Sequence, residues 1–298
     1  MRLKFHTLDV FTNHKFEGNP LAVVLEADHL TTAQMQTITR EFNLSETTFV
    51  MKPDDPAHTA KMRIFFPGGE MPFAGHPTLG TAILLAELRG LDEVRFELKA
   101  GLTPVKITRD ANVLSGVFTA PVIPYHVAKP LPSIEDTARA LNLDPADIGF
   151  DGHQIALLEG GPRFFYVPVK TRTALEKSQV RQPYWAELLA PLGGSTDAAY
   201  IYTRGGDGAN AHFRARMYAP TGGIPEDPAT GSATALLAAQ LLSAEGLKAG
   251  THIWHLEQGY EMGRPSDLRL EADVNSGKLT AVRVGGSAVR MMSGEIEV

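Results

Sequence analysis

Two stretches of this 298-residue chain share one pattern, a polar turn followed by a helix that is apolar on every side. Residues 227–233 (DPATGSA) align without gaps on residues 76–82 (HPTLGTA), 151 positions earlier. Apolar or small residues follow in both stretches, over 234–242 and 83–88. A helix without a polar face has to be buried on all sides. The chain is therefore predicted to contain two units, each built around an interior helix.

A second match supports an internal duplication. The spacing of 151 positions also relates Glu46, in the stretch 44–50, to Asp197, in the stretch 195–201. Equal spacings at two separate places favour duplication over a chance match. Short alternating stretches typical of strands outnumber helices in both halves. We therefore expect an α+β fold of two pseudo-symmetric halves, each a curved β-sheet or barrel wrapped around a buried central helix.

The two halves are assigned to residues 1–120 and 121–280. Prolines at 121, 124, 130 and 132 mark the crossover between them. Strands over 281–298 are available to complete the first half. Local signals set several element ends: a turn at 110–112, a helix that stops at Gly193-Gly194, and a helix that starts with Asp227 as its N-cap and Pro228 in its first position.

The composition of the chain excludes several classes of protein. The net charge is −6 and there is no basic block, which argues against nucleic acid as a partner. The chain has no cysteine, so disulfides, thiolate metal sites and thiol catalysis are excluded. Residues 1–11 alternate like a strand and do not resemble a signal peptide, and no apolar run is long enough to span a bilayer. A cytoplasmic protein without membrane contact is expected.

No cofactor or metal is expected either. Nucleotide-binding glycine motifs and the serine-hydrolase motif are missing from the sequence. His252 and His255 are the nearest approach to a metal motif, but at strand spacing their side chains point to opposite faces.

Three titratable residues are candidates for acid–base catalysis. Glu46 begins a strand among apolar neighbours, and a partly desolvated glutamate has a raised pKa that suits a general base. His76 and Asp227 occupy matching places at the two helix starts, where each could also serve only as a cap or a core residue. Two such groups facing each other across a cleft could divide the acid and base roles.

The helix starts also predict an anion site. Gly75 and Gly231 would let a ligand approach backbone N–H groups closely, and Ser232 adds a hydroxyl donor. Because both helix ends carry a partial positive charge, a substrate carboxylate is the expected ligand.

Taken together, these residues resemble the PhzF family of phenazine-biosynthesis-like isomerases. The matching stretches run in order along nearly the whole chain: 9–11, 18–23, 43–47, 75–80, 226–233, 257–259 and 263–266. The match is specific for the family and says little about the substrate.

The resemblance implies the diaminopimelate-epimerase-like fold, with the active site between its halves, and usually a homodimer. Related racemases place two cysteines at the helix starts, where this chain has His76 and Asp227. Known family chemistry is the isomerisation of trans-2,3-dihydro-3-hydroxyanthranilate, with a glutamate at the position of Glu46 as proton carrier. The resemblance also places Asn19 among the substrate-binding residues. It assigns no role to Gln258 or Arg264.

We therefore expect a cofactor-independent isomerase acting on a small cyclic amino- or hydroxy-carboxylate. Glu46 would remove a proton from carbon and return it elsewhere, while Asp227 and His76 polarise the substrate. One alternative is an epimerase that uses Glu46 and Asp227 as a two-base pair. A second is a small-ligand binding protein that has lost the chemistry. Turnover and the fate of the stereocentre distinguish the three.

Overall fold

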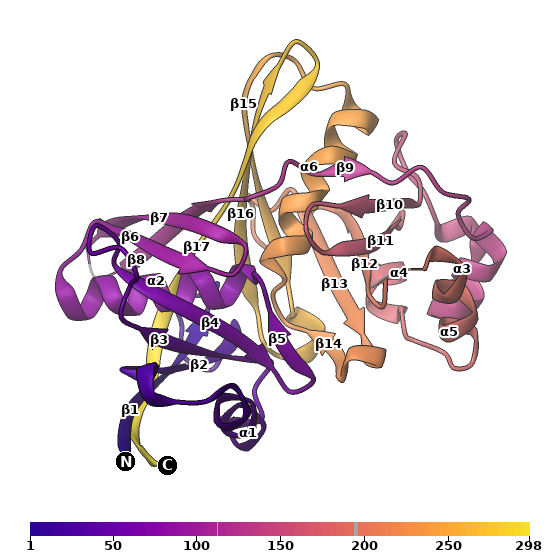
Figure 1. The fold of residues 1–298 in the computed structure, drawn as a ribbon. Coiled ribbons are helices and arrows are strands. Elements are labelled where there is room, and N and C mark those ends of the chain that lie inside the picture. Colours follow the sequence, from indigo (N-terminus) through magenta and orange to yellow (C-terminus); the bar gives the residue numbers. More distant parts are fainter. Residues whose placement is uncertain (112, 194–195) are drawn as a thin grey trace.

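The computed structural model describes residues 1–111, 113–193 and 196–298 (Figure 1). Its first half contains β1 (Arg2–Val10), β2 (Asn19–Val24), α1 (Thr32–Phe42), β3 (Glu46–Met51), β4 (Ala60–Phe66), β5 (Gly69–Met71), α2 (Gly75–Arg89), β6 (Glu93–Leu98), β7 (Gly101–Asp110) and β8 (Val113–Thr119). The second contains β9 (Tyr125–His126), α3 (Ile134–Leu141), β10 (Ala156–Glu159), β11 (Arg163–Pro168), α4 (Arg172–Lys177), α5 (Tyr184–Leu189), β12 (Ala199–Arg204), β13 (Phe213–Ala219), β14 (Ile224–Asp227), α6 (Gly231–Glu245), β15 (Gly250–Gln258), β16 (Ser266–Asn275) and β17 (Lys278–Glu297).

The two halves repeat the same strand pairings. In the first, β2 pairs parallel with β3, β3 antiparallel with β4, and β4 parallel with β6. In the second, β11 pairs parallel with β12, β12 antiparallel with β13, and β13 parallel with β15. The central helix lies in the same crossover of each half, α2 before β6 and α6 before β15. This confirms the α+β fold of two pseudo-symmetric halves.

Each half is completed by a strand that crosses from the other. β17 pairs with β16 and β8, and its distal part pairs with β1, where Arg2 lies opposite Glu297. The two chain ends therefore lie side by side in Figure 1. In the opposite direction, the chain leaves β8 and forms β9, which pairs with β10. The bounds assigned to the halves from the sequence stay a prediction.

Both central helices are buried as predicted. Every residue of α2 from Gly75 to Ala86 is buried, and α6 is buried over most of its length. Strands β1, β2, β7, β8 and β17 surround α2, while β10, β16 and β17 contact α6. Each leucine buried in this way contributes about 1.5–3 kcal/mol, so the two apolar helices contribute substantially to the core.

The predicted helix starts are wrong in detail. α6 begins at Gly231 with Thr230 as its N-cap, so Asp227 is not the cap and Pro228 is not helical. Asp227 instead ends β14, and its carboxylate accepts hydrogen bonds from side chains rather than from helix amides. α2 begins at Gly75, so the helix starts are 156 positions apart and the gapless match of 151 does not align the elements. The gapless alignment was wrong because β14 ends at Asp227, a residue that the sequence analysis assigned to the start of the helix.

Some expected details lie outside the described residues. The turn expected at 110–112, the helix end at Gly193-Gly194 and the start of the stretch 195–201 include residues 112, 194 and 195.

The two central helices meet at their first residues. A Cβ atom built on Gly75 would lie 3.2 Å from the Cα and carbonyl carbon of Gly231. A Cβ on Gly231 would lie 3.1 Å from Cζ of Phe11, which is fully buried. Glycine at both positions therefore lets the two halves touch through their helix ends.

Alanine at position 75 is expected to push the helices apart. Because the clashing atoms are backbone, the neighbour cannot turn away, and overpacking of this kind costs about 1–3 kcal/mol. We expect Gly75→Ala to lower the free energy of unfolding in urea by that amount. Gly69→Ala is the control, since its Cβ would meet the Phe66 ring at an ordinary 3.6 Å. Equal stability of the two variants would contradict the close helix contact.

Candidate active site

Four polar residues from different elements come together beside the helix contact. Glu46 is the first residue of β3, His76 lies in the first turn of α2, Asp227 ends β14, and Asn19 begins β2. Their exposed fractions are 6%, 4%, 6% and 0%. The parallel pairing of β2 with β3, which sets Leu21 opposite Glu46, brings Asn19 to the same end of the sheet. The structure thus unites residues that are up to 208 positions apart.

Asn19 connects the two halves at this site. Its side-chain nitrogen Nδ2 donates to Oδ1 of Asp227 at 2.7 Å and to the carbonyl of Ala229 at 2.9 Å. The same nitrogen lies 3.3 Å from Nδ1 of His76. Asp227 and Ala229 belong to the second half, whereas Asn19 and His76 belong to the first, so the amide joins the halves directly.

Three buried polar atoms at the site have no hydrogen-bond partner among the described residues. They are Oε2 of Glu46, Nε2 of His76 and Oδ1 of Asn19. The first two are 3.2 Å apart, close enough for an ion pair, yet their alignment does not make a hydrogen bond. Unpaired buried polar atoms are costly and uncommon. A cluster of them in one place indicates a site whose ligand would supply the missing partners.

Burial shifts the protonation of all three titratable residues. It raises the pKa of Glu46 well above its usual value, and the charge of Asp227 adds to the rise. It raises the pKa of Asp227 to about 6, although hydrogen bonds from Thr230 and Asn19 oppose the change. It lowers the pKa of His76 to about 3, against a hydrogen bond to the Pro20 carbonyl. At neutral pH His76 is therefore uncharged, and burial favours the uncharged form of both carboxyl groups.

The predicted anion-binding residues lie next to these groups. Gly75 and Gly231 are the first residues of α2 and α6 and touch each other, and Ser232 follows in α6. Helix N-termini carry unpaired N–H groups and attract anions. Binding of a carboxylate between them stays a prediction. Asp197, matched with Glu46 in the sequence, is exposed and lies two positions before β12.

Gln258, which the sequence left without a role, is buried at the end of β15 and holds the Asp227 turn. Its Oε1 accepts from the backbone N–H of Thr230 at 3.1 Å, and its Nε2 donates to the Asp227 carbonyl at 2.8 Å. Nε2 also donates to the hydroxyl of Thr230 at 2.9 Å, and that hydroxyl donates to Oδ2 of Asp227 at 2.5 Å. Sequence reasoning missed Thr230, whose only signal was its place within the repeated stretch.

Arg264 fixes the loop that leads to Asn19. Its Nη2 donates to Oδ1 of Asp9 and to the Glu17 carbonyl, both at 2.6 Å, and its Nε donates to the Gly18 carbonyl at 3.0 Å. The backbone N–H of Gly18 donates in return to the carbonyl of Pro265 at 2.8 Å. Arg264 therefore joins a loop of the second half to the residues directly before β2.

A lysine at position 264 cannot reproduce this fork, because its ammonium is a point charge without a planar set of donors. A hydrogen bond to a charged group is worth about 1.5–3 kcal/mol, so amides of residues 11–19 should exchange with solvent about 10–100-fold faster in Arg264→Lys. Hydrogen exchange followed by mass spectrometry measures this. Arg283→Lys is the control, because Arg283 binds Asp273 elsewhere. Unchanged exchange over 11–19 would show that Arg264 does not fix the loop.

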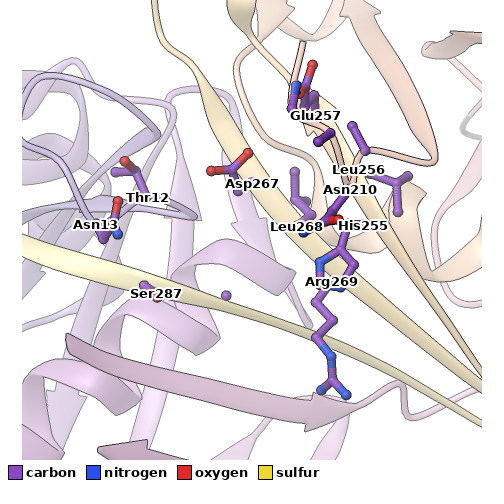
Figure 2. A pocket seen from close by; sticks show the side chains of 14 residues that line it. Thr12, Asn13, Asn210, His255, Leu256, Glu257, Asp267, Leu268, Arg269 and Ser287 are labelled. Carbon is purple, nitrogen blue, oxygen red and sulfur yellow. The ribbon is translucent and has the colours of Figure 1, made fainter. Parts of the chain in front are cut away.

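An open cavity of about 360 Å³ lies near the crossing strands but is separate from these groups. Figure 2 shows Thr12 and Asn13 on one side of it and His255 and Arg269 on the other. Glu46, His76, Asp227 and Asn19 do not line it. The candidate site is thus a buried site that is distinct from this surface cavity.

Comparison of the chain with known proteins identifies one family. The family model described as phenazine biosynthesis-like protein covers residues 8–294. The chain belongs to the PhzF family. This PhzF-family protein is 41% identical to an uncharacterized isomerase of Mesorhizobium japonicum, over 97% of this chain and 96% of that protein. It is 33% identical to the trans-2,3-dihydro-3-hydroxyanthranilate isomerase of Pseudomonas aeruginosa, over 98% of both.

Comparison with solved structures supports the same family. The structure superposes on the PhzF-family phenazine biosynthesis protein of Bacillus anthracis with a TM-score of 0.88, at 27% identity over the full length of both chains. A hydroxyproline epimerase of Agrobacterium vitis shares the fold with a TM-score of 0.60 at 14% identity, covering 99% of this chain and 91% of that one. The protein is an isomerase with the PhzF fold, as predicted.

Two further findings concern the parts of the chain that the structure describes. None of their helices is long and apolar enough to cross a membrane. Their histidines and acidic residues form no group of three that could hold a metal ion.

Proposed function

We propose that this PhzF-family isomerase carries a proton between two carbon atoms of a small cyclic amino- or hydroxy-carboxylate, without a cofactor. The reaction would resemble that of the trans-2,3-dihydro-3-hydroxyanthranilate isomerases. The observation that supports it most is the buried carboxyl of Glu46. Its Oε2 has no hydrogen-bond partner among the described residues and lies 3.2 Å from Nε2 of the neutral His76. A carbon-bound proton needs a positioned acid–base group of matched pKa, and such a group contributes about 10²–10⁴-fold to the rate.

The neighbouring residues suit the remaining tasks. Asp227 and Asn19 offer a carboxylate and an amide oxygen to a substrate amino or hydroxyl group. Neutral His76 can accept or donate a hydrogen bond. The first-turn N–H groups around Gly75, Gly231 and Ser232 would hold the substrate carboxylate. A homodimer in the cytoplasm, with no nucleic-acid or membrane partner, belongs to the same proposal, and light scattering during gel filtration tests the dimer.

Incubation in D₂O with a panel of cyclic amino- and hydroxy-carboxylates tests the reaction. The panel includes trans-2,3-dihydro-3-hydroxyanthranilate, and proton NMR follows loss or gain of signal at each C–H position. We expect deuterium to enter a C–H position while a double bond moves, and we expect no such change with Glu46→Gln. If no compound exchanges but some raise the melting temperature, the protein is a binder and the proposal is wrong.

One observation favours the alternative that the protein is an epimerase. Two buried carboxyl groups, Glu46 and Asp227, interact at one site, and a two-base epimerase needs such a pair. An epimerase would exchange the proton at one stereocentre and invert it, with every double bond unmoved. Chiral chromatography of the products from the same panel therefore separates the two activities.

A further inference from the structure

A short connection binds parts of the site that belong to different halves. It runs from residue 259 to residue 265, between β15 and β16. Directly before it, Gln258 binds the Asp227 turn, and near its end Arg264 binds the residues that precede Asn19. Asp227 belongs to the second half of the protein and Asn19 to the first. The connection between β15 and β16 is therefore attached to both sides of the site.

The connection is folded tightly against the Asp227 turn. Gly259 has a φ of +78°, in the left-handed region that favours glycine. A Cβ atom at this position would lie 2.6 Å from the carbonyl oxygen of Pro228 and 2.4 Å from that of Arg264. The backbone N–H of Arg264 donates to the carbonyl of Gly259 at 2.9 Å. The two ends of the connection are thus in direct contact, so a displacement of one end displaces the other.

A buried arginine, Arg214 on β13, holds this connection in place. It is 4% exposed, and its Nε and Nη2 lie 3.0 and 2.9 Å from Oε1 of Glu261. Its guanidinium carbon lies 4.2 Å from the centre of the Tyr260 ring, a cation–π contact. Its Nη1 donates to Oδ2 of Asp207 at 2.9 Å and lies 3.5 Å from Oε2 of Glu257. Arg214 therefore contacts two residues of the connection and the end of the strand that leads into it.

Arginine suits this position because several partners have to be bound at once. The guanidinium fork serves Glu261 and Asp207 with different nitrogens, while its flat face covers an aromatic ring. Lysine carries the charge but lacks the planar set of donors. The carboxylate of Glu257 is fixed as well, since it accepts from the backbone N–H groups of Asp207 at 2.8 Å and of Gly208 at 2.7 Å. Arg214 is thus held in a rigid frame within the second half.

Arg214 does not bind the site itself. Within the described residues, the hydrogen bonds and ion pairs of its side chain go to Asp207, Glu257 and Glu261, which all belong to the second half. The first half is reached only one step further on, where Arg264 donates to the Glu17 and Gly18 carbonyls. An effect of Arg214 on the first half is therefore expected to pass through the connection.

We infer that Arg214 is a positioning residue of the active site. It holds the connection between β15 and β16, and through Gln258 and Arg264 the connection sets Asp227 against Asn19 across the two halves. This inference rests on the proposed function for its effect on catalysis. Its structural part can be measured without any substrate.

Hydrogen exchange followed by mass spectrometry tests the structural part. Arg214→Lys keeps the charge and loses the fork, so amides of residues 11–19 in the other half should exchange about tenfold faster. Arg216→Lys is the matched control. Arg216 is also a buried arginine of β13, but it binds Glu226 and the carbonyls of residues 175–178, all in the second half. It should leave exchange over 11–19 at the wild-type rate.

Two results of this experiment would overturn the inference. The first is unchanged exchange over 11–19 in Arg214→Lys, and the second is an equal increase in Arg216→Lys, which would mean general loosening around β13. Glu261→Gln decides the matter should Arg214→Lys fail to fold. It leaves Arg214 in place and weakens one of its contacts, so it should raise exchange over 11–19 by a smaller factor.

A double variant shows whether Arg214 acts through Arg264. If the two residues act in series, Arg214→Lys combined with Arg264→Lys should exchange over 11–19 within about twofold of Arg264→Lys alone. Independent routes would instead multiply the two increases. A multiplied increase would show that Arg214 reaches the first half by another route, contrary to the inference.

Kinetics then separate the inference from the proposed function. Since a misplacement of about 1 Å at a reacting site can cost on the order of 10²-fold in rate, Arg214→Lys should lower kcat by about 10–100-fold on a substrate found in the panel. The dissociation constant should change by less than about tenfold, because Arg214 is not a substrate-binding group. Wild-type kcat in Arg214→Lys would refute its catalytic effect. Lack of turnover by the wild-type protein, with the expected exchange pattern, would refute the proposed function alone.

Discussion

Glutamine in place of Glu46 is expected to reduce turnover by about 10²–10⁴-fold or more, the usual contribution of a positioned acid–base group. Glutamine keeps the size of the side chain and its place on β3 but cannot give or take the proton. Ligand affinity should stay within about tenfold, because the helix-end donors and Asn19 are unchanged. The loss should therefore appear in kcat and leave the dissociation constant nearly unchanged.

Two further variants make the result specific. Glu46→Asp keeps a carboxyl group but withdraws it by one methylene, so its activity should fall between those of wild type and Glu46→Gln. Asp197→Asn is the matched control, because Asp197 corresponds to Glu46 in the sequence match but is exposed in the fold. Steady-state kinetics on a substrate found in the panel decide the question. Near-wild-type turnover of Glu46→Gln would remove Glu46 from the mechanism and make Asp227 the leading candidate.

The duplication and the buried helices could be predicted from the sequence because both follow from local patterns. An apolar helix has to be buried whatever its partners are, and repeated strand and turn signals indicate repeated topology. Glu46, His76 and Asp227 could be proposed for the same reason, since each lies at an element end within a repeated stretch. The prediction that Asp227 is an N-cap was wrong because a strand as short as β14 has no sequence pattern that distinguishes it from the residues just before a helix.

The roles of Thr230, Gln258 and Arg264 could not be predicted. Each acts through a contact between segments far apart in the sequence: Gln258 is 31 positions from Asp227, and Arg264 is 255 positions from Asp9. Such contacts depend on the pairing of strands that are distant in the sequence. The sequence offered strands over 281–298 to complete the first half, but the pairing of β17 with β1 is a long-range contact that no local pattern identifies.

Removing the charge from Asp227 is expected to stabilise the protein at high pH. Burial raises the pKa of this residue from 3.8 to about 6. A group whose pKa is raised on folding contributes its full stability below the unfolded pKa and loses it as the pH rises through the folded pKa. Wild-type stability should therefore fall between about pH 4 and pH 6, by on the order of 3 kcal/mol from this residue. Glu46, whose pKa is raised by burial as well, acts in the same direction.

Asp227→Asn cannot ionise and should escape this loss. Its free energy of unfolding should match that of wild type near pH 4 and exceed it above pH 6.5. The difference between the two proteins removes the contribution of titrating groups that do not interact with Asp227, and it retains the effect of the Asp227 charge on Glu46. Urea unfolding from pH 4 to pH 8 measures the difference, with Glu41→Gln, at an exposed position of α1, as the control. Turnover of Asp227→Asn should fall while its stability rises, because a buried charge kept for catalysis is a cost to folding. A difference that does not change with pH would show that Asp227 is not buried as a charge in the free protein.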